Sequence, residues 1–193
     1  MTTFLTSDFH FHHKRICEYS NRPWAQEDNT ETLINIWNRD VQPNDTVYHL
    51  GDFSFAGSSK VAEVWSIIKR LNGKKKFIFG NHDNRSLWEL VECKAWEENL
   101  QDKVEILGDY HEMKIDKQHV VLCHYPLRTW NKKHYGSYML FGHCHGSLVI
   151  PDERTMDVGI DAHPEWKLYS WQEIRDKMSL IQKPIIDHHN SPV

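Results

Sequence analysis

The stretch Lys76-Phe-Ile-Phe-Gly-Asn-His-Asp83 runs from a β-like apolar segment directly into a polar block. Similar blocks flank it in the chain: DFH at 8–10 and GD at 51–52 lie upstream, and His124 and GHCH at 142–145 lie downstream. Each block stands at or just after a hydrophobic run, which is where strands end and where α/β proteins place their ligands. Several His, two Asp and one Asn converging there would make a mixed nitrogen and oxygen site large enough for two metal ions.

Hydrophobic patterning between these blocks predicts alternating strands and helices in the first half of the chain. Strands are expected at 3–7, 46–50 and 75–79, and helices at 27–41 and 58–71, the second stopped by Asn72-Gly73. This order favours a parallel or mixed sheet with crossover helices. In the second half, few helices are expected between short strands at 104–107, 110–115, 119–123, 138–141 and 156–160, and a closing helix is expected at 171–181 with Ser170 as its cap.

Bulk composition is that of a globular protein. With 193 residues, 39% hydrophobic and 26% charged, the chain is predicted to form one domain over 1–182, followed by a poorly ordered tail at 183–193. A net charge of −4 provides no general basic field for nucleic acid, although it leaves room for a local basic patch. The four cysteines form no CxxC pair, which argues against a zinc knuckle and a redox motif. No signal peptide or transmembrane stretch is visible, so we expect a cytoplasmic location and no membrane partner.

Read in order as DxH, GD, GNHD, H and GHxH, the polar blocks resemble the motifs of the calcineurin-like metallophosphoesterases. They extend from Asp8 to His145 of the 193 residues. The resemblance implies an α/β fold, a four-layer αββα sandwich of two mixed β-sheets flanked by helices, with the site at one end. The predicted strand and helix order agrees with that fold.

The resemblance also implies a cofactor of two divalent metal ions, with manganese first and iron, zinc or nickel as alternatives. These metals suit His, Asp and Asn ligands better than calcium does. Asp52 is the expected bridge, because one carboxylate can give an oxygen to each of two cations. The implied ligands are Asp8, His10, Asp52 and His145 for one ion, and Asp52, Asn81, His124 and His143 for the other. If Asp8 and His10 lie on extended backbone, their side chains point the same way.

By the same resemblance, His82 is not a ligand but the group that protonates the leaving oxygen. Asp83 either orients His82 as part of the catalytic apparatus or serves as a turn residue, and the sequence leaves both open. The implied function is hydrolysis of phosphodiesters, with nucleotide-type substrates favoured, by a metal-bridging hydroxide. A phosphomonoesterase on a small substrate is the alternative. The expected partner is a phosphate ester, such as a nucleotide or a nucleic-acid end.

One segment departs from the pattern of small bacterial and phage-type members, which often begin DxHFGHxN. Here residues 8–15 read DFHFHHKR, so His13 matches the second motif His while His12 replaces the Gly and puts the local backbone in doubt. NRP at 21–23 and DVGID at 157–161 also resemble segments of that subgroup. His13 and Arg22 are therefore candidate substrate-phosphate contacts, with solvated polar residues as the alternative.

Two other readings explain less of the sequence. An HxH at His10 and His12 is also found in amidohydrolase-type metal hydrolases, but these need a barrel of about 250 residues and leave GNHD and GHCH without a role. A protein-interaction scaffold of the same fold does not need catalysis and is expected to have lost His82 or a metal ligand. Here His82 and all the expected ligands are present. After Gly51-Asp52 the chain reads Phe-Ser-Phe, unlike the GDxVDRG of Ser/Thr protein phosphatases. Homo-oligomers are common in the family and are an open possibility here.

Overall fold

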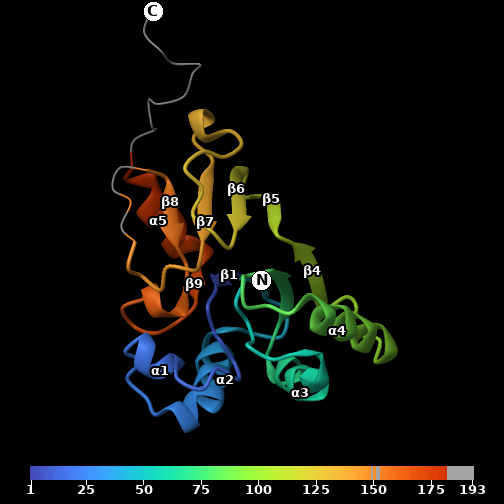
Figure 1. Cartoon of the computed structure of the whole chain (residues 1–193). Coiled ribbons are helices and arrows are strands. Elements are labelled where there is room, and N and C mark those ends of the chain that lie inside the picture. Colours follow the sequence, from blue (N-terminus) through green and yellow to red (C-terminus); the bar gives the residue numbers. More distant parts are fainter. Residues whose placement is uncertain (149, 151–152, 182–193) are drawn as a thin grey trace, which may run out of the picture.

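Two β-sheets lie face to face with helices around them (Figure 1). The structure is a computed structural model, and it describes residues 1–148, 150 and 153–181. The predicted tail at 183–193 lies outside the described residues. Both sheets are mixed, which confirms the predicted α/β fold of two mixed sheets flanked by helices.

The first sheet has five strands, and four of them run parallel. In spatial order they are β4 (Val104–Gly108), β3 (Lys74–Ile78), β2 (Thr46–Leu50), β1 (Thr3–Thr6) and the antiparallel β9 (Tyr169–Ser170). Parallel neighbours need crossover connections. These are supplied by α2 (Asn29–Asp40), α3 (Val61–Arg70) and α4 (Arg85–Glu97).

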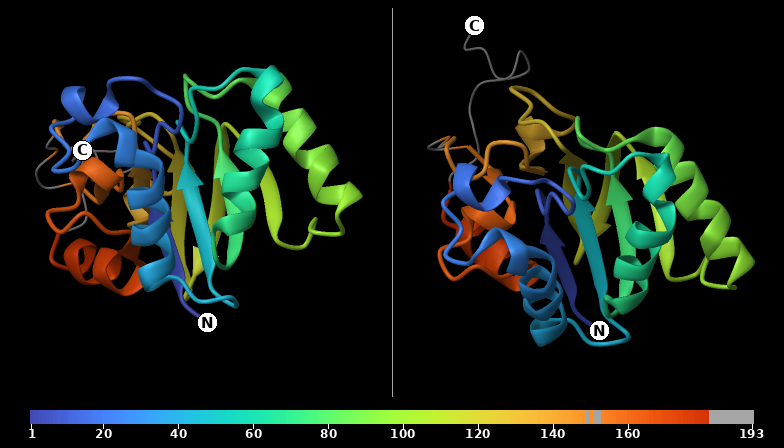
Figure 2. Two further views of the ribbon diagram at one scale, coloured as in Figure 1. Left: turned by 90° about the horizontal axis from the view of Figure 1, so that it is seen from below. Right: turned by 60° about the horizontal axis from the view of Figure 1, so that its bottom comes forward.

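Side chains of this sheet alternate between two cores. Phe4, Val47 and Phe77 pack with buried residues of the three crossover helices, which Figure 2 shows together on one side of the sheet. Their neighbours Leu5 and Leu50 pack instead with residues of the second sheet. Strands buried on both faces read as continuous hydrophobic runs, which is why the sequence predicted them well.

The second sheet has the order β5 (Tyr110–Ile115), β6 (Gln118–Cys123), β7 (Tyr138–Phe141) and β8 (Thr155–Asp157). β5 and β6, both expected as strands, form a hairpin in which Asp116 and Lys117 both have positive φ, as a tight hairpin turn requires. β6, β7 and β8 run parallel. The strand predicted at 156–160 is shorter, because the chain turns into a 3-10 segment, η4 (Ile160–Ala162).

The closing helix α5 (Trp171–Ser179) begins at the predicted cap, Ser170, whose side chain accepts a hydrogen bond from the Glu173 amide. Glu173 completes a capping box by accepting from the Ser170 amide at 2.9 Å, and its other oxygen pairs with Lys167 at 2.8 Å. Partial burial opposes ionisation of Glu173, but these donors outweigh it and lower its pKa to about 2. Buried Trp171, Ile174 and Met178 fix the helix to the core between the sheets.

Helix α4 was not among the predicted elements, and neither was the short α1 (Ile16–Tyr19). Signals for α4 exist in the sequence. Asn84 is its N-cap and accepts from the Leu87 amide at 2.9 Å, and buried Trp88, Val91 and Ala95 follow at helical spacing. The remaining short turns are 3-10 segments: η1 (Gln26–Asp28), η2 (Ser58–Lys60) and η3 (Lys133–Tyr135).

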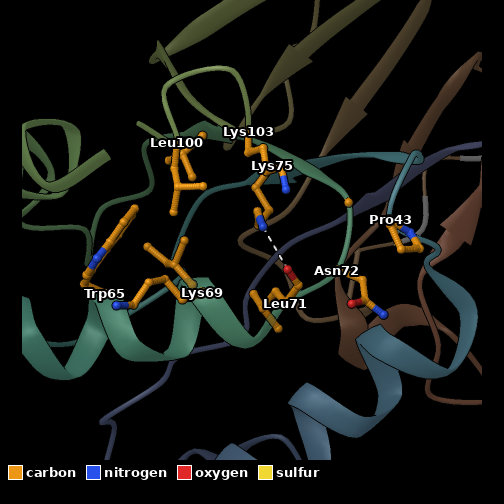
Figure 3. Close-up of a pocket in the computed structure, with 11 residues that line it drawn as sticks. Pro43, Trp65, Lys69, Leu71, Asn72, Lys75, Leu100 and Lys103 are labelled. Carbon is orange, nitrogen blue, oxygen red and sulfur yellow. Dashed lines mark hydrogen bonds between the residues drawn. The ribbon is translucent and has the colours of Figure 1, made fainter. Parts of the chain in front are cut away.

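A cavity of about 260 Å³ lies at the amino ends of the parallel strands (Figure 3). Lys75 lines it and donates to the Leu71 carbonyl at 2.8 Å, just past the last residue of α3. Burial lowers the Lys75 pKa to about 8. This lysine satisfies a helix-end carbonyl, which is a structural role.

Within the described residues we find no helical segment with the length and hydropathy that a bilayer span requires. The cytoplasmic location, the homo-oligomer and the division at residue 182 stay predictions.

Candidate metal centre

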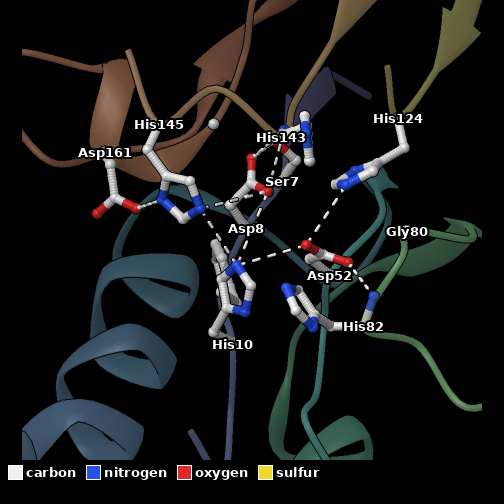
Figure 4. Close-up of polar contacts among 12 residues, drawn as sticks. Ser7, Asp8, His10, Asp52, Gly80, His82, His124, His143, His145 and Asp161 are labelled. Carbon is white, nitrogen blue, oxygen red and sulfur yellow. Dashed lines mark hydrogen bonds and ion pairs between the residues drawn. The ribbon is translucent and has the colours of Figure 1, made fainter. Parts of the chain in front are cut away.

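The carboxyl ends of strands from both sheets meet at one end of the sandwich. β1 and β2 are in parallel register, and beyond them the Asp8 amide donates to the Gly51 carbonyl at 3.0 Å. In the second sheet, the Gly142 amide donates to the His124 carbonyl at 2.9 Å beyond β6 and β7. Within each sheet, the loops that carry predicted ligands are thus joined by a backbone hydrogen bond. Figure 4 shows the side chains that these loops bring together.

A first group of potential ligands consists of Asp8, His10 and His145, whose ligand atoms lie within 4.8 Å of one another. The Nε2 atoms of His10 and His145 are 3.3 Å apart, and each lies 3.9 Å from Asp8 Oδ1. The Nδ1 atom of His145 donates to the Asp161 carboxylate at 2.6 Å, which leaves its Nε2 lone pair for a metal. Among the residues that the structure describes, the buried Nδ1 of His10 has no hydrogen-bond partner.

Asp52, His124 and His143 form a second group with the same closeness. The Nδ1 atom of His124 donates to the Leu50 carbonyl at 2.9 Å, so its Nε2 carries a lone pair. That Nε2 lies 3.0 Å from Asn81 Oδ1 and 3.4 Å from Asp52 Oδ2. All the predicted ligands are therefore brought together, and Asn81 joins the second group.

Asp52 lies between the two groups (Figure 4). Its Oδ2 atom is 3.5 Å from His10 Nε2 and 3.4 Å from His124 Nε2, while Oδ1 accepts from the His82 amide at 2.8 Å. Burial opposes ionisation of Asp52, but the adjacent His124 ring and the hydrogen bond from the His82 amide outweigh it and lower its pKa to about 2 in the metal-free protein. An ionised carboxylate in this place suits the predicted bridging role.

The chemistry of these residues fits two divalent cations. Imidazole and carboxylate lone pairs face one another at the centre of each group, an arrangement that a cation between them stabilises. Burial raises the Asp8 pKa to about 7 and lowers the His10 pKa to about 3, so both side chains resist charge in the metal-free protein. A cation at this position would neutralise the charge of the buried Asp8 carboxylate, and the neutral His10 imidazole would offer it a lone pair as a ligand.

The backbone at the ligands differs from the extended conformation considered for Asp8 and His10. Their φ values are 62° and 51°, and Asp52, His143 and His145 are also left-handed. β1 ends at Thr6, so Asp8 and His10 both lie in the loop beyond the strand. Gly80 allows the chain to approach Asp52 closely, because a Cβ there would lie 2.1 Å from Asp52 Oδ1.

Of the two roles left open for Asp83, orienting His82 or serving as a turn residue, its contacts favour a structural one in the loops. Its carboxylate is buried and accepts from the amides of Asp52 at 2.7 Å, Gly80 at 2.9 Å, Phe53 at 3.1 Å and Ser54 at 3.3 Å. These donors use both oxygens and join the loops that follow β2 and β3. Asp83 is therefore a positioning residue that fixes the Asp52 loop, and no hydrogen bond joins it to the His82 ring among the described contacts.

Arg22 does not occupy the predicted position of a substrate contact. Its side chain has 0% exposure, and it pairs with Asp161 at 2.8 and 3.0 Å. The other donors reach the carbonyls of Asp8 at 2.7 Å and Phe9 at 3.0 Å, and the Asn29 side chain at 3.0 Å. All five guanidinium N–H groups are thereby used inside the protein, leaving none for a phosphate.

Sequence reasoning missed Asp161, although it noted the segment around it. Asp161 lies between His145 and Arg22 and orients the first toward the metal group. Burial opposes its ionisation, but the hydrogen bonds from His145 and Arg22 prevail and hold the Asp161 pKa below its ordinary value. Its place in the DVGID segment at 157–161 was the sequence signal that could have marked it as a carboxylate partner for a ligand His. Ser7 was also missed, and it donates to Asp8 at 2.5 Å.

A cavity of about 650 Å³ opens over the two groups. His82 and His13 both line it, together with His143 and His145. The His82 ring is exposed and its centroid lies 5.3 Å from that of His10. His12 keeps a left-handed φ of 66°, the conformation favoured by the Gly it replaces, and its Nδ1 lies 2.9 Å from Ser54 Oγ.

Comparison with known proteins places the chain among relatives of one kind. Gene 66 protein of Mycobacterium phage L5 is 29% identical over 202 residues, covering 94% of this chain and 96% of that protein. An uncharacterized protein of Methanocaldococcus jannaschii is 42% identical over 81 residues, covering 42% of this chain and 46% of that protein. The crystal structure of a protein of unknown function from Aquifex aeolicus shares the fold, with a TM-score of 0.65, 21% identity, and coverage of 91% of this chain and 98% of that one.

A family profile described as the calcineurin-like phosphoesterase superfamily domain matches residues 1–159. That match includes every predicted ligand and His82, and the two groups that could hold metal ions lie where the strands of both sheets end. The chain therefore belongs to the calcineurin-like phosphoesterase superfamily and is a metal-dependent phosphoesterase.

Proposed function

We propose that this protein is a dinuclear phosphodiesterase that acts on nucleotide-type diesters. The position of Asp52 Oδ2, within 3.5 Å of a histidine from each group, is the observation that carries the dinuclear proposal. Asp8, His10 and His145 would hold one ion, and Asn81, His124 and His143 the other. Manganese is the first candidate because nitrogen and oxygen ligands are mixed. When bound, such a pair supplies an acidified water and neutralises charge on the phosphoryl oxygens.

His82 is proposed to donate the proton that the leaving oxygen needs. Its backbone is fixed by the 2.8 Å hydrogen bond to Asp52, while its ring is exposed to the cavity and free to meet a substrate. That combination of a fixed backbone and an accessible ring suits a general acid. His13 stands across the same cavity and is proposed as a contact for a phosphoryl oxygen.

The lining of the cavity supports a diester rather than a monoester. A phosphomonoester carries nearly two negative charges at neutral pH, whereas a diester carries one. No Lys or Arg is found among the described residues that line the cavity, and Arg22 is committed to contacts within the protein. With little cationic help beyond the ions, the singly charged diester is the better match.

Hydrolysis of bis-p-nitrophenyl phosphate and p-nitrophenyl phosphate tests this proposal directly. The metal-free protein is refilled separately with Mn²⁺, Ni²⁺, Zn²⁺ and Mg²⁺, and bound metal is counted in each sample. We expect two ions per chain and metal-dependent turnover that favours the diester. Preference for the monoester would point to a phosphatase, and a folded protein with two ions and no turnover would point to a protein-interaction scaffold.

A further inference from the structure

A second hollow, of about 470 Å³, adjoins the cavity over the metal groups. We call it the aromatic groove, lined by Tyr19 and Phe55 together with 12–15, 56, 57, 59 and 60. Tyr19 is 59% exposed and Phe55 is 50% exposed. Two large rings left this open beside an active site provide a surface on which a flat ligand group can stack.

The aromatic groove is continuous with the catalytic cavity. His13 and Tyr19 line both hollows. The Phe55 ring lies 5.0 Å from the His82 ring and 5.0 Å from the His13 ring, and His13 is 5.7 Å from Tyr19, centroid to centroid. The groove thus starts at the proposed general acid, so a group that occupies it is attached to the oxygen that His82 protonates.

Cationic side chains are also part of the groove lining. Lys14, Arg15 and Lys60 line it. Arg15 pairs with Glu18 and lies over the Tyr19 ring at 4.8 Å, and Lys60 pairs with Glu63 at 3.1 Å. Lys14 is exposed and forms no ion pair among the described residues. It is the group most available for an additional phosphate of the ligand.

We propose that the aromatic groove binds the leaving nucleoside of a nucleotide diester, whose base stacks on Phe55 and Tyr19. Bases of any kind can stack on such rings, and basic side chains in the lining attract the next phosphate of the chain. In the step, the oxygen of water bonds to phosphorus and the bond from phosphorus to the nucleoside oxygen breaks. The proton of His82 passes to that oxygen, the attacking water releases one of its protons to solvent, and His82 takes up a proton from solvent before the next turnover. This inference rests on the proposed function, because His82 defines the leaving side.

The methyl ester of thymidine 5′-phosphate distinguishes the two sides of the reaction, because methanol and thymidine are both alkoxide-type leaving groups. A nucleoside held in the groove predicts thymidine and methyl phosphate as the main products. The opposite orientation gives methanol and thymidine 5′-phosphate. Product ratios are measured by phosphorus NMR and chromatography with the Mn²⁺-loaded full chain, and bis-p-nitrophenyl phosphate serves as a general measure of activity.

Phe55→Leu and Tyr19→Leu remove the stacking rings while leaving apolar side chains at exposed positions. Each is expected to raise KM for the thymidine ester about tenfold, with a smaller change in kcat, and to reduce the excess of thymidine among the products. The matched control is Tyr135→Leu, since Tyr135 is 73% exposed and lines neither hollow. It is expected to behave as the wild type.

The outcomes separate the two proposals. Release of methanol as the main product, or equal kinetics for the groove variants and the control, would overturn the nucleoside site while leaving the phosphodiesterase intact. Failure of the metal-loaded wild type to hydrolyse any diester would overturn the proposed function, and the nucleoside site with it. Circular dichroism on each variant confirms that the fold is retained.

Discussion

Asp161→Asn tests the hydrogen bond by which Asp161 orients the metal-binding side chain of His145. Asp161 is 2% exposed at its side chain, accepts from His145 at 2.6 Å, and accepts two hydrogen bonds from the fully buried Arg22 at 2.8 and 3.0 Å. Asparagine keeps the shape but provides one acceptor oxygen in place of two and removes the negative charge. The buried guanidinium then has no counter-charge.

The magnitude follows from that burial. Removing one partner of a buried ion pair costs about 3–5 kcal/mol. For a domain of this size each 1 kcal/mol lowers Tm by about 2–4 °C, so the expected fall is about 6–20 °C. Loss of the carboxylate behind a ligand His is expected to weaken metal binding by about 10- to 100-fold. Because His145 belongs to the first group, we expect one ion to be lost more readily than the other.

Urea unfolding of metal-free protein measures the stability change, and dialysis against a graded chelator followed by metal counting measures the affinity change. The matched control is Asp109→Asn, which removes an Asp–Arg pair with Arg85 whose side chains are 65% and 60% exposed. Exposed pairs contribute little, so no measurable change is expected there. If Asp161→Asn and Asp109→Asn lose equal stability and both keep two ions, the argument from burial is wrong.

Three other variants test separate parts of the site and fold. His82→Ala is expected to abolish most turnover of a diester with an unactivated leaving group while metal content stays at two ions, and loss of metal would instead make His82 a ligand. Asp52→Asn is expected to lower occupancy of both ions, and unchanged stoichiometry would refute the bridge. Glu173 has its folded pKa depressed to about 2, so its contribution to stability is complete above its ordinary pKa and declines as pH falls toward 2. Urea unfolding of metal-free Glu173→Gln is therefore expected to show a smaller loss between pH 5 and 2 than wild type, and parallel curves would contradict this.

Much of the fold could be predicted because the strands are buried on both faces. In β2 and β3, Val47 and Phe77 belong to one core while their sequence neighbours Tyr48 and Ile78 pack in the other, so hydrophobic residues stand side by side in the sequence. The seven predicted ligands also come together as expected, since carboxyl ends of neighbouring parallel strands lie at one edge. Helix α4 was missed because its buried stripe is interrupted by charged residues and gives weaker periodicity.

The roles of Arg22 and Asp83 could not be predicted, for a physical reason. Asp83 belongs to the GNHD motif and Arg22 follows the DFH motif in the chain, but sequence spacing does not reveal whether a charged group faces the cavity or the interior. Arg22 faces inward because carbonyls of the loop after β1 need donors once the backbone turns left-handed. Asp83 faces inward because four amides of neighbouring loops need an acceptor. Such requirements arise only when the loops have met.

Each candidate metal group takes ligands from both sheets, and this has a consequence for the order of assembly. His10 comes from the loop after β1, whereas His145, on the other side of the same group, follows β7 at a separation of 135 residues. Neither group can exist until the sheets have docked, so the ions would bind last and only to the folded chain. Once bound, they would cross-link the two halves of the sandwich, and an excess of metal one hundred times its Kd would add about 2.7 kcal/mol to stability. Removal of metal would then loosen one sheet against the other before it disrupts either sheet.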